Sequence, residues 1–162
     1  MKELLEKISS YNLFNYLLPG TVYAFAVSNL MGIEFKEKNL FVYAFLFYFL
    51  GLVISRFGSL IIEPILKKTG FLKFAEYSDF VKASKKDDKI EILSESNNTY
   101  RTLVALIFVI GLTKFHFWLI TKWIWLERNN DWIIIVLLLI LFISSYRKQT
   151  NYITKRIKAN LE

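Results

Sequence analysis

The sequence contains no cysteine and a single histidine, His116. Without cysteine there is no disulfide framework, no thiol nucleophile and no cysteine-based metal site. His116 lies in an apolar stretch, so we expect neither a zinc site nor a histidine general base in the aqueous part of the protein. The chain also lacks the GxxxxGK(S/T) pattern of phosphate-binding loops. We therefore expect no catalytic residue, no metal and no cofactor, and we do not expect an enzyme.

Long polar stretches are scarce as well. Apolar residues make up 54% of the chain and the mean hydropathy is positive, which is unusual for a soluble domain of 162 residues. The four tryptophans, nine tyrosines and fifteen phenylalanines fit a bilayer, because aromatic rings are favoured at its interfaces. The composition therefore predicts a membrane protein.

Four apolar stretches alternate with the polar parts, and we predict that each is a transmembrane helix. The second, residues 40–62, would extend about 34 Å at about 1.5 Å per residue, enough for a hydrocarbon core of about 30 Å. We expect an all-α fold with one membrane domain, a four-helix transmembrane protein in which two hairpins are joined by a helical cytoplasmic segment. The predicted parts are spans at residues 12–33, 40–62, 103–126 and 132–146, a turn at 127–131, the central segment at 63–102 and a basic tail at 147–162.

Lysine and arginine are distributed unevenly between the polar parts. The amino end, the central segment and the tail hold two, eight and five basic residues, whereas the two other connections hold four, including Lys122, balanced by four acids. Positively charged short loops stay in the cytoplasm. We therefore predict that both termini and the central segment are cytoplasmic.

The central segment is polar but nearly neutral, with eight basic and seven acidic residues. This balance is typical of a mixed-charge surface and unlike a groove for a polyanion. Its apolar residues between Phe71 and Val81 predict a short amphipathic helix. From Ile90 the helical spacing continues through Arg101 to Val104, so we expect the third span to project into the cytoplasm as a stalk.

The first span is the most polar of the four. It carries Asn12 and Asn15, and the Pro19-Gly20 pair lies near its middle. Asparagine forms hydrogen bonds between membrane helices, and a Pro-Gly pair loosens the helix where neighbours satisfy the freed groups. Two interpretations remain: a helix packed inside a bundle, or a pore-lining helix with a hinge at Pro19 and Gly20.

Arg56 is a charged residue inside the second span. A charge at that depth is costly, so its side chain either extends to the cytoplasmic interface or pairs with an acid. The acid would be Glu63, seven residues later on the same helix face, or an acid of a neighbouring subunit. The same span contains small residues that favour close helix contact, namely Gly51, Ser55, Gly58 and Ser59.

Lys114 lies near the middle of the third span, and Trp118 and Lys122 follow at intervals of four on the same helix face. An intramembrane lysine often marks a functional site. Lys114 could line a water-filled path that favours anions. Alternatively the helix sits shallower, and Lys114 reaches the outer interface beside Trp118, Trp123 and Trp125.

The tail is strongly basic, and we expect the helix of the short fourth span to extend into it past Tyr146. Its basic residues, which include Arg147 and Lys148, fit contact with anionic lipids of the inner leaflet. The alternative is a site for a nucleotide or oligonucleotide formed together with Arg101 or Lys82.

Short motifs of the chain resemble those of small four-span bacterial membrane proteins encoded beside anti-phage defence enzymes. The motifs are YNLFNYLLPG before the first span and YSDF, KKDDKIEIL and NNTYRT before the third. The resemblance is to the membrane effector of the Hailong type, with the membrane subunit of Kiwa as a second candidate. The former implies a tetrameric, channel-like effector of the bacterial inner membrane, held shut by an oligonucleotide and opened on infection. On this resemblance, ligand-sensing or gating contacts would fall at Asn97, Asn98, Tyr100 and Arg101.

Two functional hypotheses follow. The predicted spans contain no Asp or Glu, which argues against transporters that depend on a membrane-embedded carboxylate. The first hypothesis is an oligomeric channel-like effector, with a homotetramer favoured, that is gated by a cytoplasmic ligand or partner and perturbs the membrane potential in anti-phage defence. The alternative is a membrane anchor or sensor subunit that recruits a soluble cytoplasmic partner, for example a defence protein, through the central segment.

Overall fold

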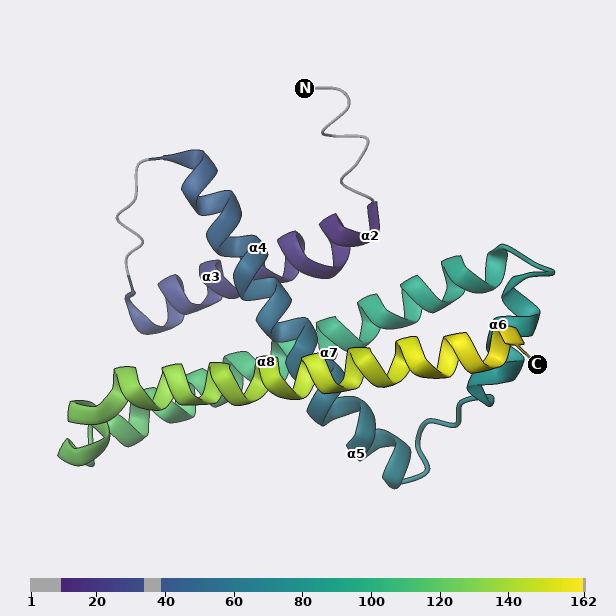
Figure 1. Ribbon diagram of the computed structural model, residues 1–162. Helices are drawn as coiled ribbons and strands as arrows, with labels where there is room; N and C mark the ends of the chain where they lie inside the picture. Colours follow the sequence, from purple (N-terminus) through teal and green to yellow (C-terminus); the bar gives the residue numbers. More distant parts are fainter. Residues whose placement is uncertain (1–9, 34–38, 162) are drawn as a thin grey trace.

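The computed structural model describes residues 10–33 and 39–161 (Figure 1). The regular elements in these ranges are helices, and no strand occurs within them, in agreement with the predicted all-α fold. The amino end and the connection at residues 34–38 carry part of the charge asymmetry behind the predicted orientation. These segments, and Glu162, lie outside the described residues.

The described chain begins with one continuous helical stretch, composed of α2 (Ser10–Asn12), η1 (Leu13–Leu17) and α3 (Leu18–Met31). η1 is a π-helical turn, in which the N–H of Leu18 donates to the carbonyl of Leu13, five residues back. Proline has no N–H and its ring collides with the carbonyl four residues earlier, so a wider turn directly before Pro19 relieves that conflict. Pro19 and Gly20, which we considered as a hinge, therefore lie within a helix that continues past them.

The next stretch is also continuous, composed of α4 (Leu40–Phe57), η2 (Gly58–Ile62) and α5 (Glu63–Lys68). It begins after Asn39, whose side-chain oxygen accepts a 2.9 Å hydrogen bond from the N–H of Phe41. It ends before Gly70, whose φ of 76° lies in the left-handed region that favours glycine. The helix thus extends past the predicted limit at residue 62 and includes Glu63.

A second π-helical turn, η2, changes the direction in which Glu63 points. The N–H of Glu63 donates to the carbonyl of Gly58, five residues back, so the turn holds about one residue more than an α-helical turn. This extra residue rotates Glu63 away from the face of Arg56. Arg56 instead donates a 3.2 Å hydrogen bond to the hydroxyl of Tyr16, so the proposed pair between Arg56 and Glu63 is not formed.

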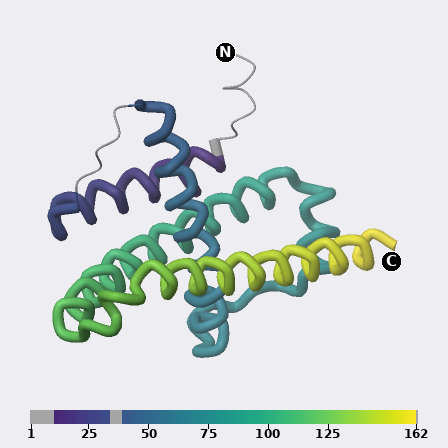
Figure 2. Tube along the Cα trace, turned by 60° about the vertical axis from the view of Figure 1, so that its left-hand side comes forward, coloured from purple at the N-terminus to yellow at the C-terminus, as the bar shows by residue number. Residues whose placement is uncertain are grey.

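Three further helices complete the described chain: α6 (Tyr77–Ser84), α7 (Lys89–Ile120) and α8 (Ile124–Leu161). α7 runs without a break from the polar central segment into the apolar third stretch, as the spacing from Ile90 predicts. α8 likewise continues from its apolar part past Tyr146 into the basic tail. In Figures 1 and 2 the α7–α8 turn lies at one end of the molecule, and α6 and the end of α8 lie at the other.

The turn between α7 and α8 lies at residues 121–123, so the predicted turn at residues 127–131 is wrong. Those polar residues belong to the first turns of α8. Glu127 is favourable there because the helix N-terminus carries partial positive charge. The side chain of Asn129 donates a 2.8 Å hydrogen bond to the carbonyl of Trp125, so it is satisfied within the helix.

The predicted amphipathic helix is shorter than the apolar pattern suggests. α6 begins at Tyr77, and residues 71–76 are irregular. The reason is local: Gly70 adopts a left-handed conformation, and Glu76 is extended with φ −60° and ψ 145°. Val81 is buried, and the ring of Tyr77 lies 5.8 Å from that of Tyr152, so α6 packs against the far end of α8.

Three of the described helices are long and apolar enough to cross a membrane: Leu40–Lys68, Lys89–Ile120 and Ile124–Leu161. The stretch at residues 10–31 is not among them, because its polar residues lower its hydropathy. Only 11% of the residues in the most apolar part of α7 are buried, and 0% in that of α8. These helices therefore present a large apolar surface to their surroundings.

α3 and α4 approach each other closely at two glycines. A Cβ atom on Gly20 of α3 would overlap the carbonyl oxygen of Phe47 in α4, and one on Gly51 of α4 would overlap that of Tyr16 in η1, which directly precedes α3. No side chain fits at either position. α4 then crosses α7 and α8 (Figures 1 and 2), with a core at the crossing. The buried members of this core are Ile54, Ile62, Ala105 and Leu106.

The close contact at Gly51 yields a testable prediction. We expect Gly51→Ala to destabilise the purified protein in detergent by about 1–3 kcal/mol, because its Cβ would overlap backbone atoms of Tyr16 and force η1 and α4 apart. The matched control is Gly111→Ala, where a Cβ meets nothing within 4 Å. Thermal unfolding followed by circular dichroism measures both. Equal melting temperatures for the two variants would contradict the described packing.

Candidate functional site

A buried carboxylate, Glu63, lies where three helices meet. Its Oε2 atom is 2.7 Å from Nη1 of Arg101 on α7. Its Oε1 atom is 3.2 Å from Nζ of Lys67 in its own helix and 3.4 Å from Nζ of Lys148 on α8. The side chain of Glu63 is 8% exposed, so these contacts replace the water that it loses on burial. One acid thus connects the continuous α4–α5 helix to α7 and α8.

The local backbone explains how Lys148 joins this cluster. The carbonyl of Ser59 would normally accept a hydrogen bond from the N–H of residue 63 or 64. The N–H of Glu63 donates to Gly58 instead, and Pro64 has no N–H. Nζ of Lys148 takes that place, donating to the carbonyl oxygen of Ser59 at 2.6 Å and to its Oγ at 2.7 Å. The π-helical turn therefore creates an acceptor for α8.

The cluster contains more positive than negative charge. Three basic side chains contact one carboxylate, and two of them are largely shielded, with exposures of 18% for Arg101 and 25% for Lys148. The Nε atom of Arg101 is buried and has no hydrogen-bond partner among the described residues. A buried donor without a partner is costly, so a group that accepts its hydrogen bond would be stabilised there.

A second polar contact set adjoins the first. Oγ1 of Thr102 donates to Oδ1 of Asn15 at 2.7 Å, and Nδ2 of Asn15 donates to Oγ of Ser55 at 3.2 Å. All three side chains are buried. Thr102 directly follows Arg101, so the two sets form one layer of polar contacts between helices. We call this layer the polar seam; its residues are Asn15, Ser55, Ser59, Glu63, Arg101, Thr102 and Lys148.

Several seam residues were missed in the search for functional residues. The serines of the second span were considered only as small packing residues, although Ser55, Ser59 and Glu63 follow one another at intervals of four. That spacing indicates a polar face on an otherwise apolar helix. Thr102 gave no such signal, because a threonine at the start of a span is common. Its partners are known only from the tertiary structure.

The structure separates the predicted ligand residues into two groups. Arg101 and Lys148 meet at Glu63, and the carbonyl oxygen of Asn98 lies 2.9 Å from Oγ1 of Thr102, as a second acceptor for the hydroxyl that bonds Asn15. The residues of the other group are exposed. Asn97 and Tyr100 lie on α7 beside Arg101, whereas Lys82 and Arg147 lie outside the charge cluster around Glu63.

The predicted gating residues are also spread over the molecule. Pro19 and Gly20 are buried against α4, and Arg56 contacts Tyr16. Lys114 and Trp118 are exposed on the C-terminal half of α7, and Trp118 stacks on Phe115 with ring centroids 5.7 Å apart. His116, on the same half, forms a 2.8 Å hydrogen bond with Asn130 that links α7 to α8. Lys114 is thus twelve residues along α7 from Thr102, the nearest seam residue in that helix.

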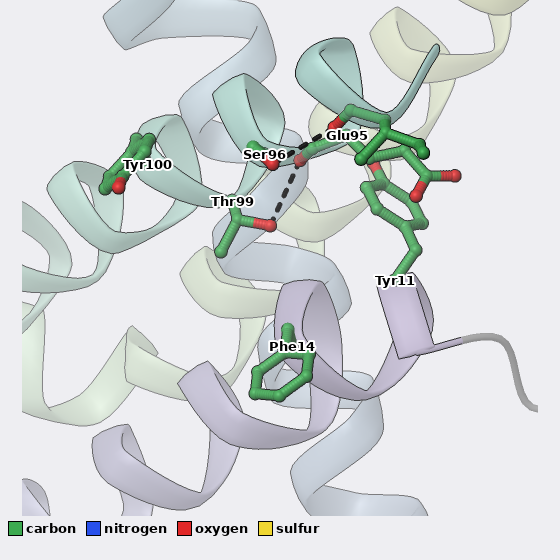
Figure 3. Close-up of a pocket in the computed structure, with 7 residues that line it drawn as sticks. Tyr11, Phe14, Glu95, Ser96, Thr99 and Tyr100 are labelled. Atoms are coloured by element: carbon green, nitrogen blue, oxygen red, sulfur yellow. Dashed lines mark hydrogen bonds between the residues drawn. The ribbon is translucent and has the colours of Figure 1, made fainter. Parts of the chain in front are cut away.

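Two pockets adjoin the polar half of α7. The first, about 370 Å³, lies between the α2–η1 stretch and α7, where Tyr11 points toward Glu95 (Figure 3). The hydroxyls of Ser96 and Thr99 donate to main-chain carbonyls of their own helix, so the pocket offers mainly aromatic rings and a carboxylate. Such a lining does not suit an anion. The second pocket, about 210 Å³, is lined by Glu63, Asn97, Tyr100 and Arg101 together with apolar residues of α5, α7 and residues 71–74.

Comparison with known proteins adds no relative to these observations. No family model, no curated protein and no solved structure matches the chain. Within residues 10–33 and 39–161, no group of three or more His, Asp or Glu could hold a metal ion. The resemblance of short motifs to defence-associated membrane proteins stays a prediction.

The central role of Glu63 can be tested by removing its charge. We expect Glu63→Gln to lower the free energy of unfolding by about 3 kcal/mol, because it leaves three neighbouring cations without their anion. The control is Glu91→Gln, an exposed acid of α7. Denaturation in mixed micelles compares the two variants with the parent chain.

A double-mutant cycle then assigns the effect to the contact with Arg101. We expect Arg101→Met to cost less stability in the Glu63→Gln background than in the parent chain, by about 1 kcal/mol or more. Additive effects of the two substitutions would contradict a direct pair between these side chains.

Proposed function

We propose that this protein is an inner-membrane, four-span, channel-like effector that works as an oligomer and is gated from the cytoplasm. In this proposal both termini and the segment between α5 and α7 are cytoplasmic. The observation that carries the proposal is α7, a single 32-residue helix that begins in the polar central segment and is bonded through Arg101 to Glu63. The following points support it.

The length of α7 supports coupling between a cytoplasmic event and the membrane. Its 32 residues extend about 48 Å, which exceeds a hydrocarbon core of about 30 Å. The excess lies at the polar end, from Lys89 toward Arg101. A ligand or partner that displaces this end therefore acts on Arg101, and through the polar seam on α4, α5 and α8.

The polar first stretch supports a fourth span inside a bundle. Its Asn15 is fully buried and is satisfied by Ser55 and Thr102, and the helix approaches α4 closely through Gly20 and Gly51. A helix whose polar groups bond to neighbouring helices is stable in a membrane even when its own hydropathy is modest.

The apolar surface along the membrane part of α7 supports an oligomeric conducting form. In the described residues, a cavity beside that part is lined by apolar residues from Val104 to Leu112. A conducting path would therefore be formed between copies, and a homotetramer is the arrangement we favour. The exposed Lys114 and Trp118 would then face the path or the outer interface. Opening would depolarise the cell, the outcome that the resemblance to defence effectors implies.

Reconstitution of the purified protein into planar bilayers tests this function. We expect stepwise conductance that prefers anions, and we expect Lys114→Leu to lower the preference for anions several-fold by removing a positive charge from the path. The control is Lys155→Gln, an exposed residue near the end of α8. Absence of conductance from the full-length oligomer, with and without cytoplasmic nucleotides, would sink the channel hypothesis.

A membrane anchor that recruits a soluble partner is the second candidate. The observation that favours it is the exposure of apolar residues on the projecting end of α7, 62% for Ile92 and 67% for Leu93. An amphipathic helix face of this kind is a common docking surface. We expect Ile92→Glu to abolish co-purification of a partner under this hypothesis. Toxicity that persists in cells lacking the partner would favour the channel instead.

A further inference from the structure

The second pocket combines a charged floor with apolar walls. Glu63 and Arg101 lie in its lining, and most of the remaining wall is apolar, including Phe71, Phe74 and Val104. Phe71 is 77% exposed and Phe74 is 49% exposed, so aromatic rings border its mouth. Exposed aromatic rings of this kind are favoured at the level of lipid headgroups.

The basic groups beside this pocket outnumber its single acid, which suits an anion. Both carboxylate oxygens of Glu63 already contact basic groups, and those groups outnumber it three to one. Lys67 is 41% exposed, and its Nζ lies 3.9 Å from the centre of the Phe74 ring at the pocket mouth. Among the described residues, the buried Nε of Arg101 has no hydrogen-bond partner. An anion that enters beside Lys67 therefore meets the cations of Lys67 and Arg101.

An apolar groove continues from the pocket along α7. A cavity of about 430 Å³ is lined by Val104, Ile107, Phe108, Gly111 and Leu112, and it shares Val104 with the charged pocket. These residues follow Arg101 at helical spacings of three and four, so they lie on one face. A Cβ on Gly111 would meet nothing within 4 Å, so the groove is open there.

The length of this combined surface matches one leaflet of a bilayer. From Arg101 to Leu112 the helix rises about 16 Å at about 1.5 Å per residue. Half of a hydrocarbon core of about 30 Å is about 15 Å. A cationic pocket at one end and an apolar groove of this length fit a phosphate headgroup and the acyl chain attached to it.

We propose that the pocket and groove form a specific site for an anionic phospholipid of the inner leaflet. Its phosphate interacts with Lys67 and Arg101, and one acyl chain lies along Val104, Gly111 and Leu112. This assignment rests on the membrane orientation proposed above, but it does not require conduction. A soluble nucleotide shares the phosphate chemistry, yet it has no group to fill the apolar groove.

Native mass spectrometry of the delipidated full-length protein in detergent tests the site. We expect dioleoyl phosphatidylglycerol to be retained at least fivefold more than dioleoyl phosphatidylcholine. Lys67→Gln should lower retention of the anionic lipid about fivefold, the effect of one lysine beside an anionic headgroup. Gly111→Phe places an aromatic ring in the groove at a position where a Cβ meets nothing within 4 Å, and it should lower retention to a similar extent.

Two exposed substitutions are matched controls, Lys85→Gln for the charge and Leu137→Phe for the added ring, and neither should change retention by more than twofold. Circular dichroism shows whether each variant is folded, and the native mass spectra give its oligomeric state.

Equal retention of the two lipids would overturn the proposal, as would a change in retention of less than twofold in either Lys67→Gln or Gly111→Phe. Complete displacement of the lipid by millimolar inorganic phosphate would overturn it in favour of a free-phosphate site. Because binding is measured without conductance, failure here is distinct from failure of the channel hypothesis.

Discussion

Burial of one negative charge is the constraint on which this structure depends. A carboxylate removed from water must be compensated by nearby cations and hydrogen bonds. Glu63 obtains this compensation from its own helix through Lys67, from α7 through Arg101 and from α8 through Lys148. These contacts determine where the three helices can lie relative to one another, and the small apolar core at the crossing of α4 and α7 packs beside them.

The two prolines of the chain make this arrangement possible. Each π-helical turn ends two residues before a proline, η1 before Pro19 and η2 before Pro64. The wider turn moves the carbonyl with which the proline ring would collide. It also shifts the helical register and frees a carbonyl, so that Asn15 and Glu63 point between helices and Ser59 accepts a hydrogen bond from Lys148. The π-helical turn that relieves the steric conflict at each proline thus places polar groups in the interior.

The polar seam and the apolar groove of the proposed lipid site meet at Arg101, so the two proposals share this residue. This residue belongs to a helix that is polar at one end and apolar at the other, and it lies close to the change between them. Its guanidinium pairs with Glu63 on one side, and its Nε atom has no hydrogen-bond partner in the part of the chain that the structure describes. Arg101 thus contacts a neighbouring helix, lies on the helix that a cytoplasmic ligand would displace, and adjoins the proposed headgroup site. It can therefore connect the three.

The sequence by itself determined the all-helical character, the membrane-length apolar helices and the continuity of α7 and α8, because these follow from composition and from spacing along one helix. The resemblance, the subunit number and the role of Lys114 stay predictions. Only the tertiary structure decided which charges pair. Helical spacing placed Arg56 and Glu63 on one face, but η2 rotated them apart, and the partners of Glu63 come from positions 38 and 85 residues away in the chain. Such contacts depend on how the helices cross. The crossing is determined by the close approaches at Gly20 and Gly51, by the π-helical turns η1 and η2, and by the buried charge of Glu63.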